Sequence, residues 1–144
     1  MSKIKLLSIL FVFSLLNCTN KATYEIAGKK SKVIVSMIAA VNEKNAEKYV
    51  AEFAENVKVF VESEIKVNGR ESLKANRANH FKNHPNVTSE IQHLVEIDDK
   101  VILHDKVWLD ESDKAGQNIV EIFTFKNDKV IRVDVIQPKD LFKK

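Results

Sequence analysis

Hydrophobic residues in the first part of the chain recur at helical spacing. The repeat of three to four residues predicts helices over residues 31–42, 46–54 and 71–82. Ser31 is the expected N-cap of the first helix, and Pro85 follows the end of the third. The front of the chain is therefore expected to supply helices that bury one apolar face.

Apolar and polar residues alternate in the later part of the chain, as in half-buried strands. The expected strands cover residues 57–61, 87–97, 101–109, 118–125 and 130–136. Asn127 and Asp128 separate the last two, which predicts a hairpin with a two-residue turn. Helices followed by an antiparallel meander indicate an α+β fold, in which a curved antiparallel sheet wraps around the N-terminal helices.

Three of the expected strands carry one ionisable residue each on an otherwise apolar face: His93, Asp105 and Glu121. If residues 98–100 form the whole first loop, His93 lies opposite Asp105. If the next hairpin is centred near Asp113, Asp105 lies opposite Glu121. The three side chains would then form a row that faces the helices.

Such a row permits three interpretations. Two close carboxylates in an apolar cavity cannot both ionise cheaply, so they could exchange protons with a ligand, with His93 assisting. The same space could bind a small apolar or amphipathic molecule without chemistry, or the polar groups could form a purely structural network. The residues expected to line a ligand pocket are Met37, Phe53, Leu103, Phe123 and Phe125.

The first 18 residues have the pattern of a secretion signal. Two lysines precede the apolar run Leu6–Leu16, which as a helix would span only ~16 Å, about half of a bilayer core. Leu15-Leu16-Asn17-Cys18 resembles the bacterial lipobox, although a small residue is usual where Asn17 stands. The sequence predicts a bacterial lipoprotein that is exported, anchored in a membrane through Cys18, and exposed to the periplasm or the cell exterior.

This assignment divides the chain into a signal peptide (1–18), a tether (19–30), one folded domain (31–138) and a C-terminal tail (139–144). The chain has 23 Lys and Arg against 20 Asp and Glu, but Lys3 and Lys5 belong to the signal, which leaves 21 basic residues. A nearly neutral domain gives nucleic-acid binding little electrostatic support. Cys18 is the sole cysteine, so no internal disulfide is expected.

Other motifs give weaker signals. His80 and His84 have a spacing that can share a metal, but no third ligand is evident, so a solvated helix face is favoured. His104 and Trp108 fall on the outer face of the sheet, where a homodimer or partner surface is possible. No Gly-rich phosphate loop or Cys-based metal site occurs, so neither a cofactor nor a metal is predicted.

Five segments carry a resemblance to a known family, and together they span about residues 31–138. They are Phe53-Ala54-Glu55-Asn56-Val57, Gly69-Arg70-Glu71-Ser72-Leu73, His84-Pro85-Asn86-Val87, Val101–Val107 and Phe125–Asp134. In this order, they resemble the SnoaL-like proteins of the nuclear transport factor 2-like superfamily. The resemblance implies a cone-shaped fold, also described as a cystatin-like roll, with an apolar pocket between sheet and helices.

Members of that superfamily include ketosteroid isomerase, polyketide cyclases, dehydratases and non-enzymatic binding or dimerisation modules. The resemblance places the isomerase's general-base aspartate at Val61 and its oxyanion tyrosine at Met37, while its protonated aspartate corresponds to Glu121. Two of the three roles are missing, which argues against steroid isomerisation. The acid–base carboxylate of the cyclases could be served by Asp105 or Glu121.

Overall fold

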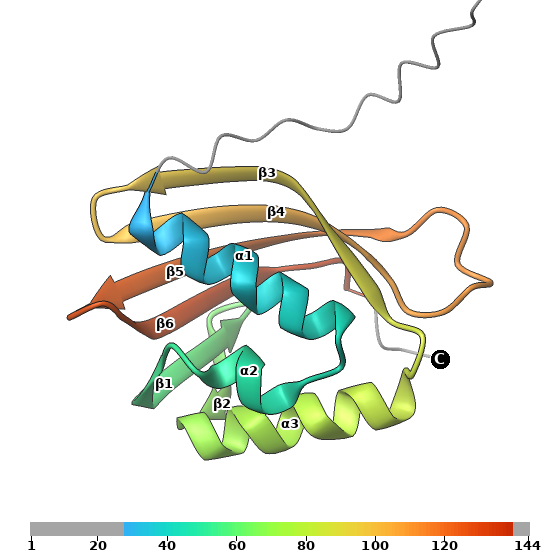
Figure 1. Cartoon of the computed structure of the whole chain (residues 1–144), viewed down its shortest axis with the longest axis horizontal. Helices are drawn as coiled ribbons and strands as arrows, with labels where there is room; N and C mark the ends of the chain where they lie inside the picture. Colours follow the sequence, from blue (N-terminus) through green and yellow to red (C-terminus); the bar gives the residue numbers. More distant parts are fainter. Residues whose placement is uncertain (1–27, 140–144) are drawn as a thin grey trace, which may run out of the picture.

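Six strands form one curved sheet, and the described helices pack against one of its faces (Figure 1). The computed structural model describes residues 28–139. The predicted signal peptide with Cys18, most of the tether, and residues 140–144 of the tail lie outside these residues. The elements are α1 (Lys29–Asn42), α2 (Ala46–Val50), β1 (Phe53–Val61), β2 (Glu64–Asn68), α3 (Arg70–Asn83), β3 (Thr88–Ile97), β4 (Lys100–Trp108), β5 (Gln117–Lys126) and β6 (Lys129–Ile136).

The strands follow the order β2-β1-β6-β5-β4-β3, and the α+β class expected from the sequence is confirmed. All neighbouring pairs are antiparallel except β1 and β6, which run parallel. The helix expected over residues 46–54 ends at Val50, and β1 already begins at Phe53. The short edge strand β2 was not predicted, although polar and apolar residues alternate over its five positions; most of its side chains are exposed.

The turn at Asn127 and Asp128 is confirmed. Both residues have positive φ angles, 50° and 61°, and Lys126 pairs with Lys129 across the turn. Such angles are those of a type I′ turn, whose twist matches that of the strands it joins.

The pairing of β3 with β4 differs from the sequence-based expectation. The turn contains two residues instead of three, because Ile97 pairs with Lys100. A bulge then interrupts the ladder between Ile91 and His93, so the side chains on either side of it point to opposite faces of the sheet. As a result, His93 pairs with His104 on the outer face. The expectation that His93 lies in one row with Asp105 and Glu121 is therefore wrong.

The bulge also determines how α1 is held on the sheet. Beyond it, Leu94 is buried and Glu96 faces α1, where its Oε2 accepts hydrogen bonds from the backbone N–H and the hydroxyl of Ser31, both at 2.8 Å. Partial burial opposes ionisation of Glu96, but these bonds and the charge of Lys30 outweigh it and hold its pKa below the usual value. Thus α1 is capped by a carboxylate from β3, and Ser31 is not its N-cap.

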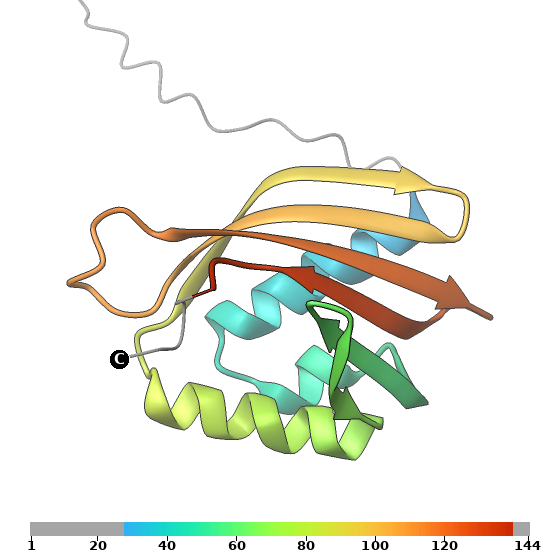
Figure 2. The ribbon, with the colours of Figure 1, turned by 180° about the vertical axis from the view of Figure 1, so that it is seen from behind.

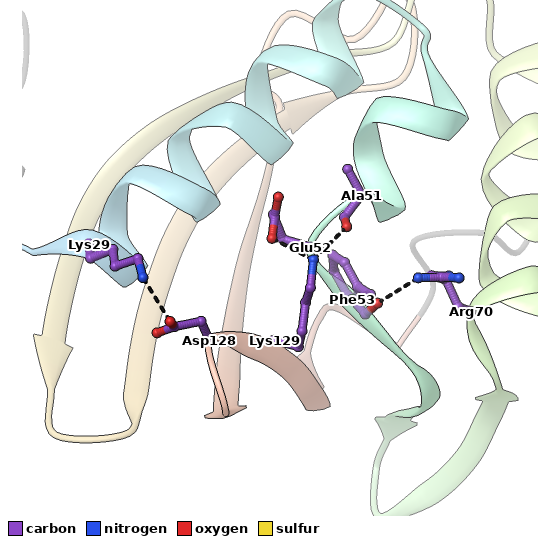
Figure 3. A network of polar contacts seen from close by, with 7 residues as sticks. All are labelled: Lys29, Ala51, Glu52, Phe53, Arg70, Asp128 and Lys129. Carbon is purple, nitrogen blue, oxygen red and sulfur yellow. Dashed lines mark hydrogen bonds and ion pairs between the residues drawn. The ribbon is translucent and has the colours of Figure 1, made fainter.

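The start of β1 is fastened from two sides (Figure 3). Lys129 of β6 donates hydrogen bonds to the carbonyl of Ala51 at 3.1 Å and to the carboxylate of Glu52 at 2.8 Å. From the other side, Arg70 at the beginning of α3 donates to the carbonyl of Phe53 at 3.4 Å. These contacts tie β1 to β6 and to α3, and so help to set the distance between α3 and the sheet.

Seen from behind, the sheet presents a face that none of the described helices covers (Figure 2). Exposed apolar side chains occur at several strand positions: Ile65, Val95, Ile97 and Ile136. Within residues 28–139, no helix is both long enough and apolar enough to cross a bilayer.

Two neighbouring residues of β3 test the observed register. Leu94 is 8% exposed and Val95 is 47% exposed, the reverse of the pattern expected from uninterrupted alternation. We expect Leu94→Ala to lower the free energy of unfolding by about 2–5 kcal/mol, because it leaves a cavity in the core. Val95→Ala should change it by less than about 0.5 kcal/mol. Urea denaturation of both variants measures the difference, and a larger loss for Val95→Ala would contradict this register.

Candidate functional site

A cavity of about 520 Å³ lies between the helices and the inner face of the sheet. Its apolar lining comes from α1, α3 and five of the strands, and includes Met37, Ile38, Val41, Val59, Val61, Val67, Leu73, Val107, Ile119 and Val135. Its polar lining includes Tyr49, Asn76, Arg77, Asn79, His80, Asn83, Ser89, Asp105 and Glu121. The volume falls within the range of small-molecule sites.

The two predicted carboxylates are both found in this cavity. Asp105 on β4 is 4% exposed and Glu121 on β5 is 8% exposed. Asp105 pairs with Ile119, and Glu121 pairs with Leu103, so the two acids are diagonal neighbours on one face and not directly opposite as expected. They still lie close enough for the charge of Asp105 to act on Glu121.

Asp105 is held in place by a chain of hydrogen bonds that starts at α1. Its Oδ2 accepts a hydrogen bond of 2.6 Å from the hydroxyl of Ser89. The backbone of Ser89 in turn makes two hydrogen bonds with the side-chain amide of Asn42, at 2.8 and 2.9 Å. The second oxygen, Oδ1, is buried and has no hydrogen-bond partner among the described residues. One oxygen of the carboxylate is therefore fixed by a hydrogen bond, and the other is buried without one among the described residues.

Glu121 has a strongly shifted proton affinity. Burial, reinforced by the charge of Asp105, raises the pKa of Glu121 to about 7, although Arg77 opposes the shift. Burial also raises the pKa of Asp105, while the hydrogen bond from Ser89 lowers it. Within residues 28–139, the side chain of Glu121 accepts no hydrogen bond from a neighbour. Near neutral pH Glu121 can both accept and donate a proton.

Arg77 of α3 supplies positive charge to the cavity. Its guanidinium carbon lies 4.8 Å from the centre of the Tyr49 ring, and its charge acts on both carboxylates. The Nε of Arg77 is buried without a hydrogen-bond partner among the described residues. The cavity thus contains an unpaired donor on α3 and an unpaired acceptor on β4, each of which is costly to leave unsatisfied.

Two further titratable groups of the cavity, Tyr49 and His80, are neutral at neutral pH. Burial, the main cause, raises the pKa of Tyr49 to about 12, so its hydroxyl stays protonated. Burial and the nearby charge of Arg77 lower the pKa of His80 to about 4. At neutral pH neither side chain therefore adds a charge to the cavity.

The other sequence-based expectations have mixed outcomes. Of the five predicted pocket residues, Met37 lines this cavity, whereas Phe53, Leu103, Phe123 and Phe125 belong to the packed core. Tyr49, Arg77 and Ser89 were not recognised as site residues. Arg77 could have been found, because it interrupts the buried stripe between Leu73 and Phe81 at helical spacing.

Within residues 28–139, no three His, Cys, Asp or Glu side chains cluster in a way that could hold a metal ion.

Comparison with solved structures gives several likenesses in fold. A cystatin-fold protein from Novosphingobium aromaticivorans is 21% identical, with a TM-score of 0.66 over 73% of this chain and 95% of its own. A protein from Sinorhizobium meliloti described as a candidate polyketide cyclase is 15% identical, with a TM-score of 0.62 over 73% and 94%. A candidate ketosteroid isomerase from Kribbella flavida is 16% identical, with a TM-score of 0.63 over 76% and 78%.

No curated protein matches the chain by sequence. The family model of the SnoaL-like domain, however, matches residues 34–133, from the middle of α1 into β6. This match spans well over half of the chain and includes all six strands at least in part. The chain therefore belongs to the SnoaL-like domain family.

Proposed function

We propose that the cavity binds a small amphipathic molecule, which is mostly apolar and has a polar end that both donates and accepts hydrogen bonds. The observation that carries this proposal is a cavity of about 520 Å³ whose apolar lining is interrupted by Asp105, Glu121 and Arg77, with Asp105 Oδ1 and Arg77 Nε buried without hydrogen-bond partners among the described residues. A ligand hydroxyl could donate to Asp105, and a ligand oxygen could accept from Arg77. The apolar lining would contact the rest of the molecule.

The charge of the cavity narrows the class of ligand. Burial raises the pKa of both Asp105 and Glu121, and the charge of Asp105 further opposes ionisation of Glu121, while Arg77 carries a positive charge. An anionic ligand would be repelled by the carboxylates, while the guanidinium disfavours a strongly cationic one. A neutral ligand with hydroxyl or carbonyl groups fits this balance best.

A second candidate function is proton transfer to and from such a ligand. It is favoured by Glu121, whose pKa of about 7 suits a general acid or base at neutral pH and which has no hydrogen-bond partner within residues 28–139. Solved structures of similar fold include proteins described as candidate cyclase and isomerase. In this function Glu121 would exchange the proton, and Asp105 would raise its proton affinity.

The sequence also supports a proposal about cellular location. The lipobox-like segment ending at Cys18 suggests that the domain is exported and tethered to a bacterial membrane. A lipid anchor would keep the cavity near a source of apolar molecules. The anchor and the cavity are separate proposals, and each has its own test.

Filling the cavity tests ligand binding. Ile119 lines it, whereas its neighbour Val120 points to the outer face and pairs with His104. We expect the neutral fluorescent probe N-phenyl-1-naphthylamine to bind the parent protein, and Ile119→Trp to weaken binding by about tenfold or more, because the indole occupies the space. Val120→Trp is the matched control and should bind like the parent. Equal binding by all three proteins, or none by the parent, would refute the proposal.

The charge state of Glu121 is tested through the pH dependence of stability. Its folded-state pKa of about 7 exceeds the ordinary value of 4.5, so the folded protein binds more protons than the unfolded chain between these values. The stability associated with this group is complete below about pH 4.5 and is lost as the pH rises through about 7. Glu121→Gln should therefore stabilise the protein by roughly 1–3 kcal/mol at pH 8 and by little at pH 5.

Urea denaturation at both pH values measures this effect, and Glu111→Gln, which alters an exposed loop residue, is the control. The control should change stability by less than about 0.5 kcal/mol at either pH. An NMR titration that gives Glu121 an ordinary pKa would remove the basis for proton transfer at neutral pH, while leaving ligand binding open.

Membrane anchoring is tested in a bacterial host. We expect the parent chain to fractionate with membranes and to incorporate labelled fatty acid, and Cys18→Ser to abolish both, because the thiol is the acylated group. Asn17→Gly, which brings the segment closer to the usual lipobox, should keep both properties. Fatty-acid labelling that survives in Cys18→Ser would show that the anchor is not at this residue.

A further inference from the structure

A polar cluster on the outer face of the sheet consists of His93 on β3, His104 on β4 and Asn118 on β5. The Nδ1 atoms of the two histidines lie 3.0 Å apart, and their ring planes differ by 11°. The other ring nitrogen of His104, Nε2, lies 3.0 Å from Oδ1 of Asn118. The cluster is on the opposite side of the sheet from the cavity, and the contact is exposed.

Asn118 determines which nitrogen of His104 is free. An amide oxygen can only accept a hydrogen bond, so Nε2 of His104 carries the proton in this contact. In the neutral imidazole this leaves Nδ1 of His104 with a lone pair, directed at His93. Fixing one ring nitrogen through a neighbouring oxygen is the usual way in which proteins prepare the other nitrogen to bind a metal.

The chemistry of the two Nδ1 atoms indicates which metals could bridge them. With metal–nitrogen distances of ~2.05 Å, a metal ion bound to both atoms lies off the line that joins them, so the two rings turn toward it on binding. Imidazole nitrogens are suitable ligands for Cu(II), Ni(II) and Zn(II), and Cu(II) is bound most tightly among the divalent first-row metals.

From this arrangement we propose that His93 and His104 form a surface site for a divalent transition metal, with Cu(II) bound most tightly. The metal takes the place of the proton between the two Nδ1 atoms, and His93 changes tautomer, so that its ring proton is carried on Nε2 and the ring stays neutral. Asn118 keeps its hydrogen bond to Nε2 of His104. Water fills the other coordination positions, since the described residues supply no third His, Cys, Asp or Glu ligand.

A second pair of histidines could compete for the metal: His80 on α3 and His84 at its C-terminal cap. Their rings lie 4.9 Å apart and are tilted by 42°. The charge of Arg77 acts on His80, which is partly buried at the cavity, so a cation there would meet repulsion and a loss of hydration. His93 is exposed and His104 is half-buried on the outer face, away from Arg77, which favours metal binding at the outer pair.

The test is a titration of the full chain with CuCl₂ alone, followed by calorimetry and by electron paramagnetic resonance. A Cys18→Ser background removes the sole thiol of the chain, which would otherwise compete for copper. We expect one equivalent of Cu(II) with an axial spectrum and hyperfine structure from two nitrogens. His93→Gln/His104→Gln should weaken binding at least tenfold, while His80→Gln/His84→Gln should bind like the parent.

A variant of Asn118, next to the proposed metal ligands, distinguishes a preorganised metal site from two histidines that bind the metal independently. Asn118→Ala keeps both histidines but removes the oxygen that holds His104, and should weaken Cu(II) binding by about tenfold. Circular dichroism checks that each variant is folded. If His93→Gln/His104→Gln retains the parent's affinity and spectrum, the proposal is wrong. If Asn118→Ala binds like the parent, the preorganised site is refuted and two independent surface histidines remain.

Discussion

The pairing register of β3 with β4 determines which side chains of β3 face the helices and which face outward. Side chains alternate strictly along a strand, so a single inserted residue exchanges the inner and outer sets. The insertion lies between Ile91 and His93, and on its far side Leu94 and Glu96 face the helices. Without it, Glu96 would point away from α1, and Ser31 would lose the carboxylate that it contacts.

The cavity carries an energetic cost that a purely structural interior would avoid. Two carboxylates and one guanidinium are brought together with an unpaired atom on each side, Asp105 Oδ1 and Arg77 Nε. Apolar residues of similar size would fill such a space without the cost of removing charges from water. Sites that bind or transform ligands are where proteins accept this cost, and perturbed carboxyl groups in a cavity are typical of them. The position of Glu121 is therefore better explained by a function than by stability.

The sequence was sufficient to place Asp105 and Glu121 because β4 and β5 alternate without interruption. Each acid lies in the middle of an apolar series, and such a series has to face the helices. The same reasoning failed for His93, because the bulge is formed at Gln92, where no glycine or proline marks a break in the pattern. A run of three polar residues, 98–100, also gives no sign that only two of them form the turn.

The pocket residues were harder to predict for a different reason. Hydrophobicity identifies side chains that avoid water, and Phe53, Leu103 and Phe123 do so as members of the packed hydrophobic core. Where space is left open depends on the curvature of the sheet and on the position of α3, which are set by distant contacts such as that of Arg70 with Phe53. A residue count or a periodicity contains no information on these distances.

The positive charge of Arg77 comes from the helical layer, whereas the carboxylates of Asp105 and Glu121 come from the sheet. This separation helps to explain why the cavity stays open. Asp105 and Glu121 are fixed on the sheet, while Arg77 extends from α3, which packs on β1 and β2. The guanidinium lies against Tyr49, and no ion pair joins it to either carboxylate among the described residues. A direct ion pair would bridge the two layers and satisfy the charges internally. Because no such bridge forms among the described residues, the opposite charges of the two layers stay separate, which is consistent with the proposal that the polar end of a ligand binds between them.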